Sequence, residues 1–393
     1  MADGVENMDK RKSSIKVGLM ADWKAGELLK PFRDAATLAF EDAIEDGMID
    51  RPVELIERDI DGLPTGSTEN VLRAWKELAA EGVVAIIGPH ISENAIALRH
   101  YIETEGRIPS IGWPGTDRWQ GPWTFALNQG SLVEEGSLIA NFLAHRGVKK
   151  VATVTENTAI GAEYLAFLQK AAKLEGVRLI DNIPISQVAE DLAPVVAALK
   201  ASGADAIVYC GFGVPINRLA NAMRGSWPEG KMPLVVFTTG FLTTPWLEGG
   251  MRACQGMYGV DLYDESNPLT GEFADRFEAR FGYRSANYYT VTGYDIAAVV
   301  ARGIAYAHPL SPEGVKEGME QVKYMPAVSG GPRTLISYGP YVRRGWMGPD
   351  YLIIREAIDA EGDLWGTLPS KFAHRMTPRT RAERKALRDA ADI

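Results

Sequence analysis

Hydrophobic and polar positions follow one another in two alternating periods along this chain. Residues 15–20 form a short apolar run that is typical of a buried strand, and apolar residues then recur at helical spacing from Phe32 to Ile44. Over the next stretch we predict strands at 53–58, 83–87 and 108–112 and helices at 67–81 and 92–105. Strands that alternate with helices of this length indicate a parallel sheet covered by helices on both faces.

A second series of the same kind begins after a break near Asn128–Gly130. It predicts helices at 134–146, 161–175, 191–202 and 214–224 and strands at 150–155, 177–183, 205–209 and 234–238. A strand at 256–262, helices at 271–280 and 288–306 and a strand pair at 351–354 and 356–358 follow. Two such series predict an α/β fold with two doubly wound parallel-sheet lobes.

The composition of the chain argues against two classes of function, nucleic-acid binding and membrane insertion. The chain has 393 residues, of which 46% are hydrophobic and 24% charged, as in ordinary globular proteins. Its net charge of -9 argues against nucleic acid as the main partner, because phosphate binding needs a basic face. No run approaches the roughly 18 apolar residues of a membrane helix, so we expect no membrane insertion.

The polar residues 1–14 contain no apolar segment of the kind found in signal peptides, and we expect them to be disordered. As it stands, the sequence predicts a cytoplasmic protein. If a signal peptide has been removed and replaced, we expect a periplasmic or extracellular protein instead. Cys210 and Cys254 each lie in or beside an apolar run, which favours buried free thiols over a disulfide or a zinc site.

Motifs that carry catalysis are absent from the sequence. The glycine turn at Cys210–Ile216 lacks the third small residue of a dinucleotide-binding loop, because Ile216 stands there and Pro215 stiffens the entry. The five histidines show no metal-binding spacing. We therefore expect a protein that is not an enzyme and needs neither a cofactor nor a metal.

The loops at the carboxyl ends of the predicted strands are the candidate site, since open α/β sheets bind ligands there. In the loop 88–92, Ser92 is placed to cap the following helix, and exposed N–H groups there can hold a carboxylate or carbonyl oxygen. Trp113, Phe212, Phe241 and Trp23 follow other strands. Each aromatic residue has a structural alternative as core or lobe interface, whereas several together would line an aromatic pocket.

The segments IKVGLM, LAFEDAIEDG, VVAIIGP, IPSIGWPGT, KKVATVTENTAIG and GADAIVYCGFG carry a family resemblance. With the helix around 293–295 and a late SGGP linker, they resemble the Leu/Ile/Val-type (type I) solute-binding proteins of ABC importers, from about Ile15 to Gly366. The resemblance implies a three-crossover hinge, with crossovers near 128–130, 260–262 and 330–334. It implies a first lobe of residues 15–128 with 262–331 and a second of residues 129–261 with 332–370, followed by a basic tail, 371–393.

Position by position, the resemblance places ligand oxygen contacts on Ser92, Gly115 and Thr116, and an aromatic contact on Phe212. This chain departs from amino-acid binders at two positions: Ile160 stands where they often carry a tyrosine, and Thr239 where they place an acid for the α-ammonium group. A buried ammonium group without an ionic partner is costly, so a simple α-amino acid is disfavoured. The candidate ligand contacts are Trp23, His90, Ser92, Trp113, Gly115, Thr116, Ile160, Phe212, Thr239 and Phe241.

Two functions remain open from the sequence. The first is a solute-binding protein that closes a hinged cleft on a small carboxylate or amide with an apolar or aromatic body and delivers it to an ABC permease. The second is a cytosolic sensor of the same fold that regulates a partner protein, because Trp113–Pro114 and Thr238–Thr239 partly resemble the amide-sensor subgroup. The sequence also leaves open whether the protein forms a homodimer. It predicts a tail helix that begins at Thr377–Pro378, and this helix is either solvated or docks a partner.

Overall fold

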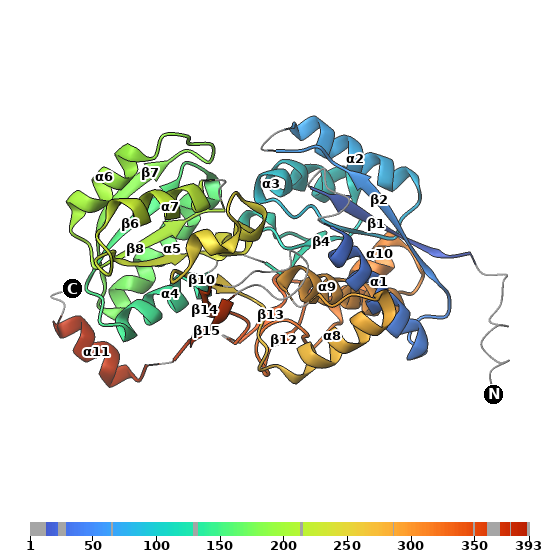
Figure 1. The fold of residues 1–393 in the computed structure, drawn as a ribbon. Coiled ribbons are helices and arrows are strands. Elements are labelled where there is room, and N and C mark those ends of the chain that lie inside the picture. The colour runs from blue at the N-terminus through green and yellow to red at the C-terminus, as the bar shows by residue number, and fades with distance from the viewer. Residues whose placement is uncertain are drawn as a thin grey trace.

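The computed structural model describes residues 13–22, 29–63, 66–128, 133–212, 215–285, 287–348, 350–359, 370–377 and 379–390. Their helices and strands form two lobes side by side, each built on its own sheet, with connecting segments between them (Figure 1). The predicted fold class, an α/β fold with two parallel-sheet lobes, is confirmed.

The first-lobe sheet has the strand order β2-β1-β3-β4-β5, and all its paired strands run parallel. The strands are β1 (Ile15–Ala21), β2 (Val53–Asp59), β3 (Ala85–Ile87), β4 (Ser110–Gly112) and β5 (Thr124–Ala126). Successive β1 side chains enter two separate hydrophobic clusters, Val17 and Leu19 on one face and Met20 on the other. Burial of both faces explains why β1 is apolar from Val17 onward, after Lys16 near its start.

Helices cover both faces of this sheet. They are α1 (Lys30–Glu45), α2 (Thr68–Ala80), α3 (Ser92–Tyr101), α8 (Pro268–Phe281), α9 (Tyr288–Tyr306) and α10 (Pro312–Glu320), and a π-helical turn, Ile102–Gly106, extends α3. Ser67 caps α2, and its side chain accepts a hydrogen bond from the Asn70 N–H. Helices α1 and α9 pack against each other, which brings the late part of the chain back onto the first lobe.

The second-lobe sheet has the order β15-β14-β10-β9-β8-β6-β7. Its strands are β6 (Lys150–Glu156), β7 (Arg178–Ile185), β8 (Ala206–Cys210), β9 (Leu234–Phe237), β10 (Tyr258–Asp261), β14 (Ile353–Ala357) and β15 (Ser370–Arg375). Strand β14 pairs antiparallel with both β10 and β15, and the remaining strand pairs are parallel. The helices are α4 (Val133–His145), α5 (Ala159–Glu175), α6 (Ala193–Ser202), α7 (Ile216–Ser226) and α11 (Arg381–Ala390), and 3-10 turns run over Thr239–Trp246 and Met251–Cys254.

Two late predictions were wrong. The segments 351–354 and 356–358 are not a strand pair, because β14 is a single strand whose partner is β15. The tail helix α11 begins at Arg381, not at 377–378: Thr380 and Glu383 exchange side-chain and main-chain hydrogen bonds as a capping box, with Thr380 as the cap and Glu383 in the first turn.

Between the lobes lies a small sheet of β11 (Met325–Pro326), β12 (Leu335–Ile336) and β13 (Trp346–Met347). The Trp346 indole N–H donates to the Asn128 carbonyl (2.9 Å), so β13 is tied to the end of the first lobe. The chain returns to the second lobe after β13, although that crossover was expected near 330–334. The lobe boundaries stay a prediction, and these contacts favour a first lobe that continues to about Met347.

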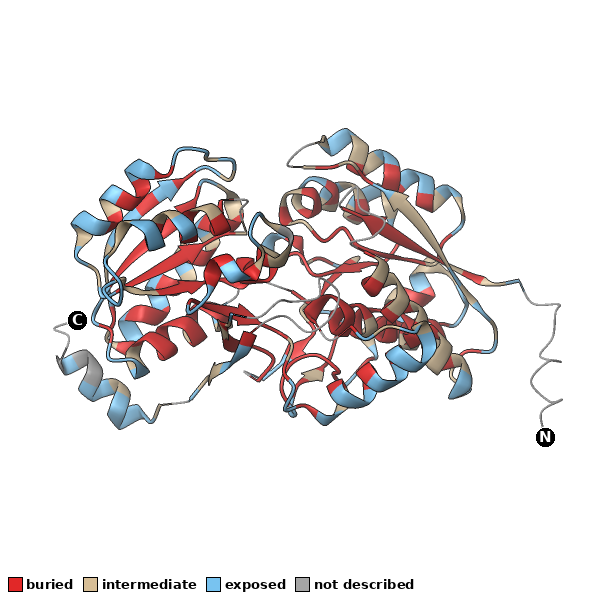
Figure 2. Cartoon of the chain, viewed as in Figure 1, coloured by how far each residue is buried: buried red, intermediate tan, exposed pale blue. Residues whose placement is uncertain are grey.

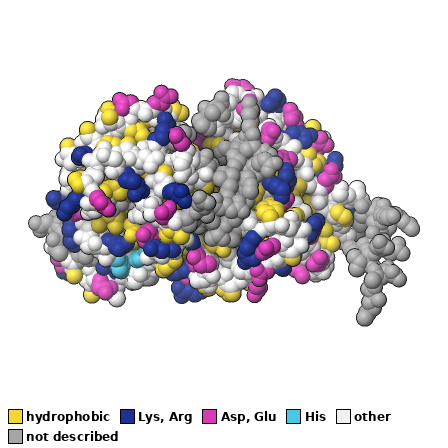
Figure 3. Space-filling model, viewed as in Figure 1, with side chains coloured by type: hydrophobic (Ala, Val, Ile, Leu, Met, Phe, Trp, Pro, Cys, Tyr) yellow, Lys and Arg dark blue, Asp and Glu magenta, His cyan; other side chains and the backbone are white. Residues whose placement is uncertain are grey.

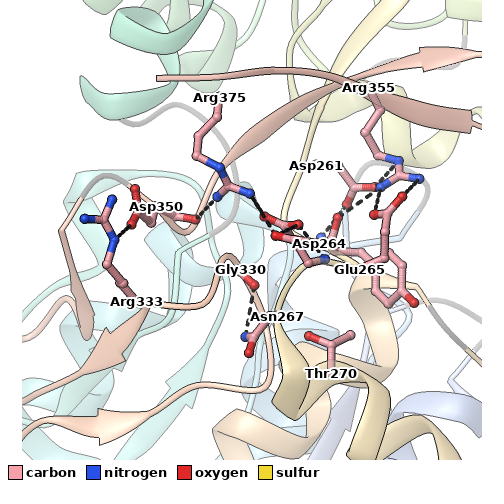
Figure 4. Close-up of polar contacts among 12 residues, drawn as sticks. Asp261, Asp264, Glu265, Asn267, Thr270, Gly330, Arg333, Asp350, Arg355 and Arg375 are labelled. Carbon is pink, nitrogen blue, oxygen red and sulfur yellow. Dashed lines mark hydrogen bonds and ion pairs between the residues drawn. The ribbon is translucent and has the colours of Figure 1, made fainter. Parts of the chain in front are cut away.

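Charged side chains hold the connecting segments together (Figure 4). Arg355 of β14, only 2% exposed, donates to Glu265 (2.5 and 3.2 Å) and to Ser370 of β15 (2.7 and 3.0 Å). Arg375 pairs with Asp264, and the Gly330 N–H donates to the Leu262 carbonyl (2.6 Å). The last strand of the chain is thereby joined to the segment that follows β10.

Burial is concentrated in the strands and in the helix faces that cover them (Figure 2). Cys210 and Cys254 are buried free thiols, as predicted, and burial raises the pKa of each above its ordinary value. None of the described helices is both long and apolar enough to cross a membrane. On the face shown in Figure 3, basic and acidic side chains are intermingled over both lobes.

Candidate functional site

Two neighbouring strand-end loops of the first lobe meet at Ser92. Strands β3 and β4 are adjacent, so the residues that follow them, 88–92 and 113–116, lie side by side. Ser92 is buried, and its hydroxyl oxygen accepts a hydrogen bond from the Gly115 N–H (3.1 Å). The prediction that Ser92 caps α3 was wrong: Ile91 occupies the cap position and Ser92 is the first helical residue. Its hydroxyl therefore joins the two loops.

His90 and Trp113 are stacked in the same place. Their ring centroids are 4.0 Å apart with an interplanar angle of 26°, and both side chains are almost fully buried. Phe32 of α1 meets both rings edge-on, at 5.1 Å from His90 and 4.8 Å from Trp113. Tyr288 and Tyr289, the first residues of α9, meet Trp113 edge-on as well. Five aromatic rings from four segments of the chain thus surround one point of the first lobe.

Asp22 anchors the loop that carries His90. Its carboxylate, at the end of β1, accepts hydrogen bonds from the His90 main-chain N–H (2.6 Å) and the Asn94 amide (2.7 Å). Burial raises the pKa of Asp22 to about 6, although these donors lower it in part. These bonds fix the His90 main chain, and Asp22 is a residue that sequence reasoning missed.

Thr116 makes a contact between the two lobes. Its hydroxyl donates to the carboxylate of Glu163 on α5 (2.9 Å), and its oxygen accepts from the Arg118 N–H (3.1 Å). Burial raises the pKa of Glu93, on the first turn of α3, and the negative charge of Glu163 adds to this rise. Thr116 was predicted to contact a ligand oxygen; here its hydroxyl holds the lobes together.

The second lobe presents the first turns of α5 and the loop after β8 to this region. Ile160 is buried one turn before Glu163, so the two side chains share a face of α5. Phe212 follows β8, is half-buried and lies 6.3 Å from the ring of Tyr164, also on α5. Ile160 and Phe212, both predicted contacts, therefore come from the end of the second lobe that bears Glu163.

Thr239 lies beside a carboxylate that was not predicted at this position. Its N–H and its hydroxyl both donate to Glu135 of α4 (2.5 and 2.7 Å), and both residues are fully buried. A second buried carboxylate, Glu156 at the end of β6, accepts from the Tyr209 hydroxyl (2.7 Å) and from Gln187 (3.1 Å). Position 239 itself carries no acid, but Glu135 of α4 places a carboxylate beside it. This weakens the argument against an α-amino acid as the ligand.

One predicted contact, Phe241, is not brought into this group. Phe241 is fully buried and stacks on Phe237 (6.5 Å) inside the second-lobe core. A Cβ atom at Gly259 would overlap the Phe241 ring, so the ring packs directly on β10. Trp23 lies outside the described residues.

Comparison with known proteins agrees with this architecture. A family model described as periplasmic binding protein matches residues 14–345. A type 1 periplasmic binding protein of Bordetella pertussis Tohama I superposes with a TM-score of 0.75 at 21% identity, covering 92% of this chain and 100% of that one. No curated protein matches the chain.

Two further solved structures are similar at comparable levels. A leucine-binding protein of Thermotoga maritima has a TM-score of 0.73 at 17% identity, covering 93% of this chain and 99% of that one. A solute-binding protein of an ABC transporter from Rhodopseudomonas palustris, in complex with 3,4-dihydroxybenzoic acid, has a TM-score of 0.70 at 21% identity, covering 92% and 98%. With the family match over most of its length, the chain belongs to the periplasmic binding proteins, a non-enzymatic family with the Leu/Ile/Val-type two-lobed fold.

Proposed function

We propose that this protein is a solute-binding protein that closes its two lobes on a small organic carboxylate or amide with an aromatic body. The observation that carries the proposal is the junction of Ser92 and Gly115 beside the stacked rings of His90 and Trp113. Hydroxyl and N–H groups suit a ligand oxygen, and aromatic walls suit a flat apolar body. The Rhodopseudomonas palustris relative, solved with a dihydroxybenzoic acid, supports this ligand class.

Closure would use contacts that lie between the lobes. The Thr116 hydroxyl and the Glu163 carboxylate belong to different lobes and are hydrogen bonded. Hinge closure is a common response of two-lobed proteins to a ligand. In this proposal Ser92 and Gly115 bind the ligand from the first lobe, Ile160 and Phe212 cover it from the second, and Thr116 with Glu163 secures the closed form.

An α-amino acid is the competing ligand, and Glu135 favours it. A carboxylate beside Thr239 could pair with an ammonium group, and two similar solute-binding proteins, from Desulfitobacterium hafniense and Streptococcus pneumoniae, were solved with leucine and with isoleucine. Against this, Glu135 already accepts two hydrogen bonds from Thr239 through one oxygen. We keep the aromatic acid as the proposal. The proposed solute-binding protein would reside outside the cytoplasm and deliver its ligand to an ABC permease. The alternative is a cytoplasmic sensor that regulates a partner protein.

Calorimetry with a matched panel tests the ligand class. We expect benzoate or 4-hydroxybenzoate to bind with micromolar affinity, about -8 kcal/mol, and leucine, isoleucine and valine to bind far more weakly. Micromolar binding of any of the three amino acids would refute the proposed class. Native mass spectrometry of protein purified from its own host would identify a retained ligand independently.

A further inference from the structure

Within the described part of the chain, the His90 imidazole is a buried polar group without a hydrogen-bond partner. The residue is 3% exposed, and neither ring nitrogen has a hydrogen-bond partner among the residues that the structure describes. Buried polar groups in folded proteins are nearly always hydrogen bonded, and those that are not are found at functional sites more often than elsewhere. The ring therefore needs an explanation beyond packing.

The protonation state of the His90 ring determines which chemical groups it can bind. Burial lowers the pKa of His90 to about 3, so the imidazole is neutral near pH 7. A neutral imidazole carries one N–H donor and one acceptor nitrogen. It can therefore pair with a group that donates, accepts or does both.

The surroundings place this ring at the proposed site and hold it there. Asp22 fixes the His90 main chain, and the ring stacks on Trp113 at 4.0 Å. A Cβ atom at Gly112 would lie 3.4 Å from the Nδ1 atom of His90, so that edge of the ring lies over the end of β4. A rigid imidazole beside the Ser92–Gly115 junction is preorganised, and little side-chain entropy remains to be lost on binding.

We infer that His90 recognises an uncharged hydroxyl or carboxamide carried on the flat part of the ligand. The inference rests on the proposed function. It concerns a second polar group of the same ligand, distinct from the oxygen bound at Ser92 and Gly115. A phenol hydroxyl and a primary amide each donate and accept, so either matches the neutral ring in both of its tautomers.

Charged groups fit this position poorly. Phe32 and Trp113 exclude water from the ring, and an unpaired charge in such surroundings is strongly disfavoured. A carboxylate would be bound best by a protonated imidazole, which burial opposes. The Asp22 carboxylate already accepts hydrogen bonds from the His90 main-chain N–H and the Asn94 amide, so it is poorly placed to pair with a ligand ammonium group.

The test compares 4-hydroxybenzoate with benzoate by calorimetry in the full-length protein, His90→Phe and His100→Phe. Phenylalanine keeps a flat ring for Trp113 and removes both nitrogens, whereas His100 is exposed on α3, the helix that follows the His90 loop, and serves as the control. We expect the wild type and His100→Phe to bind 4-hydroxybenzoate about 3- to 30-fold more tightly than benzoate. His90→Phe should lose that preference and keep its affinity for benzoate.

The outcomes separate this inference from the proposed function. If both compounds bind the wild type equally, or if His90→Phe keeps the preference, the role of His90 is refuted and the ligand class stands. If neither compound binds the wild type, the ligand class fails and the inference fails with it. The ligand-free proteins give a further readout: His90→Phe should melt about 1 to 4 °C higher, because two unmatched polar atoms are removed from a buried position. A lower melting temperature would assign the ring a structural role and overturn the inference.

Discussion

Replacing Arg355 by methionine should destabilise the protein more than any other change at the hinge. The Arg355 and Asp261 side chains are 2% and 1% exposed, and their charged atoms are 3.7 Å apart. At an effective dielectric constant of about 20, that separation corresponds to an attraction of about 4.5 kcal/mol. Burial raises the pKa of Asp261 to about 6 even though Arg355 lowers it, so the carboxylate depends on this partner.

Removing one member of a buried pair typically costs about 3 to 5 kcal/mol, because the other charge stays buried and unpaired. We expect a loss in that range for Arg355→Met, measured by urea denaturation at pH 7. Protonation of Asp261 in the variant would limit the loss. Arg333→Ala is the matched control: Arg333 pairs with Asp350 at the same hinge but is 82% exposed, so its loss should be about 0 to 1 kcal/mol.

A double-mutant cycle with Asp261→Asn completes this test. The double variant should be more stable than the sum of the single losses predicts, because neither charge is then left alone. Strict additivity, or a cost for Arg355→Met no larger than that for Arg333→Ala, would refute the view that a buried ion pair holds the hinge.

Three further predictions follow from individual contacts. Glu163→Gln should weaken the bond to Thr116 and lower the closed fraction, seen as a larger distance between dyes on the two lobes, whereas Thr116→Ser should behave as the wild type. Asn141→Leu removes two bonds to the main chain of Thr377 (3.1 Å each), so amide exchange over 374–390 should accelerate; unchanged exchange would contradict the role of Asn141. Burial raises the pKa of Asp295 to about 6, so its contribution to stability is full below about pH 4 and is lost as the pH rises through 6. The stability of the wild type relative to Asp295→Asn should therefore fall between pH 4 and pH 7 by about 3 kcal/mol, and a flat difference would show that Asp295 does not titrate as described.

The two-lobed fold could be predicted because its main elements are long and periodic. Strand β1 is apolar on both faces, and α9 has 19 residues, so their patterns are unambiguous. Strands β5, β11, β12 and β13 have two or three residues each, too few for any period to appear. Helix α10 was missed although Ser311 caps it in the ordinary way.

The sequence indicated which loops face the candidate site, but not which side chains from other elements reach these loops. Residues next to strand ends can be placed from the sequence, and the candidate contacts His90, Ser92 and Trp113 lie together in the structure, while their contact with a ligand stays a prediction. Carboxylates that arrive from other elements cannot be placed in this way: Glu135 is 104 residues from Thr239 and Glu163 is 47 from Thr116. Their partners are defined by tertiary packing, which leaves no local signal in the sequence.

Solution scattering with and without ligand tests the central claim most directly. The protein is first saturated with the aromatic acid that calorimetry identifies, and its radius of gyration is compared with that of the ligand-free protein. We expect the ligand to reduce the radius of gyration and to bring the profile to the one calculated from this structure, in which Thr116 and Glu163 are hydrogen bonded. Identical profiles at demonstrated saturation would contradict closure of the two lobes on a ligand.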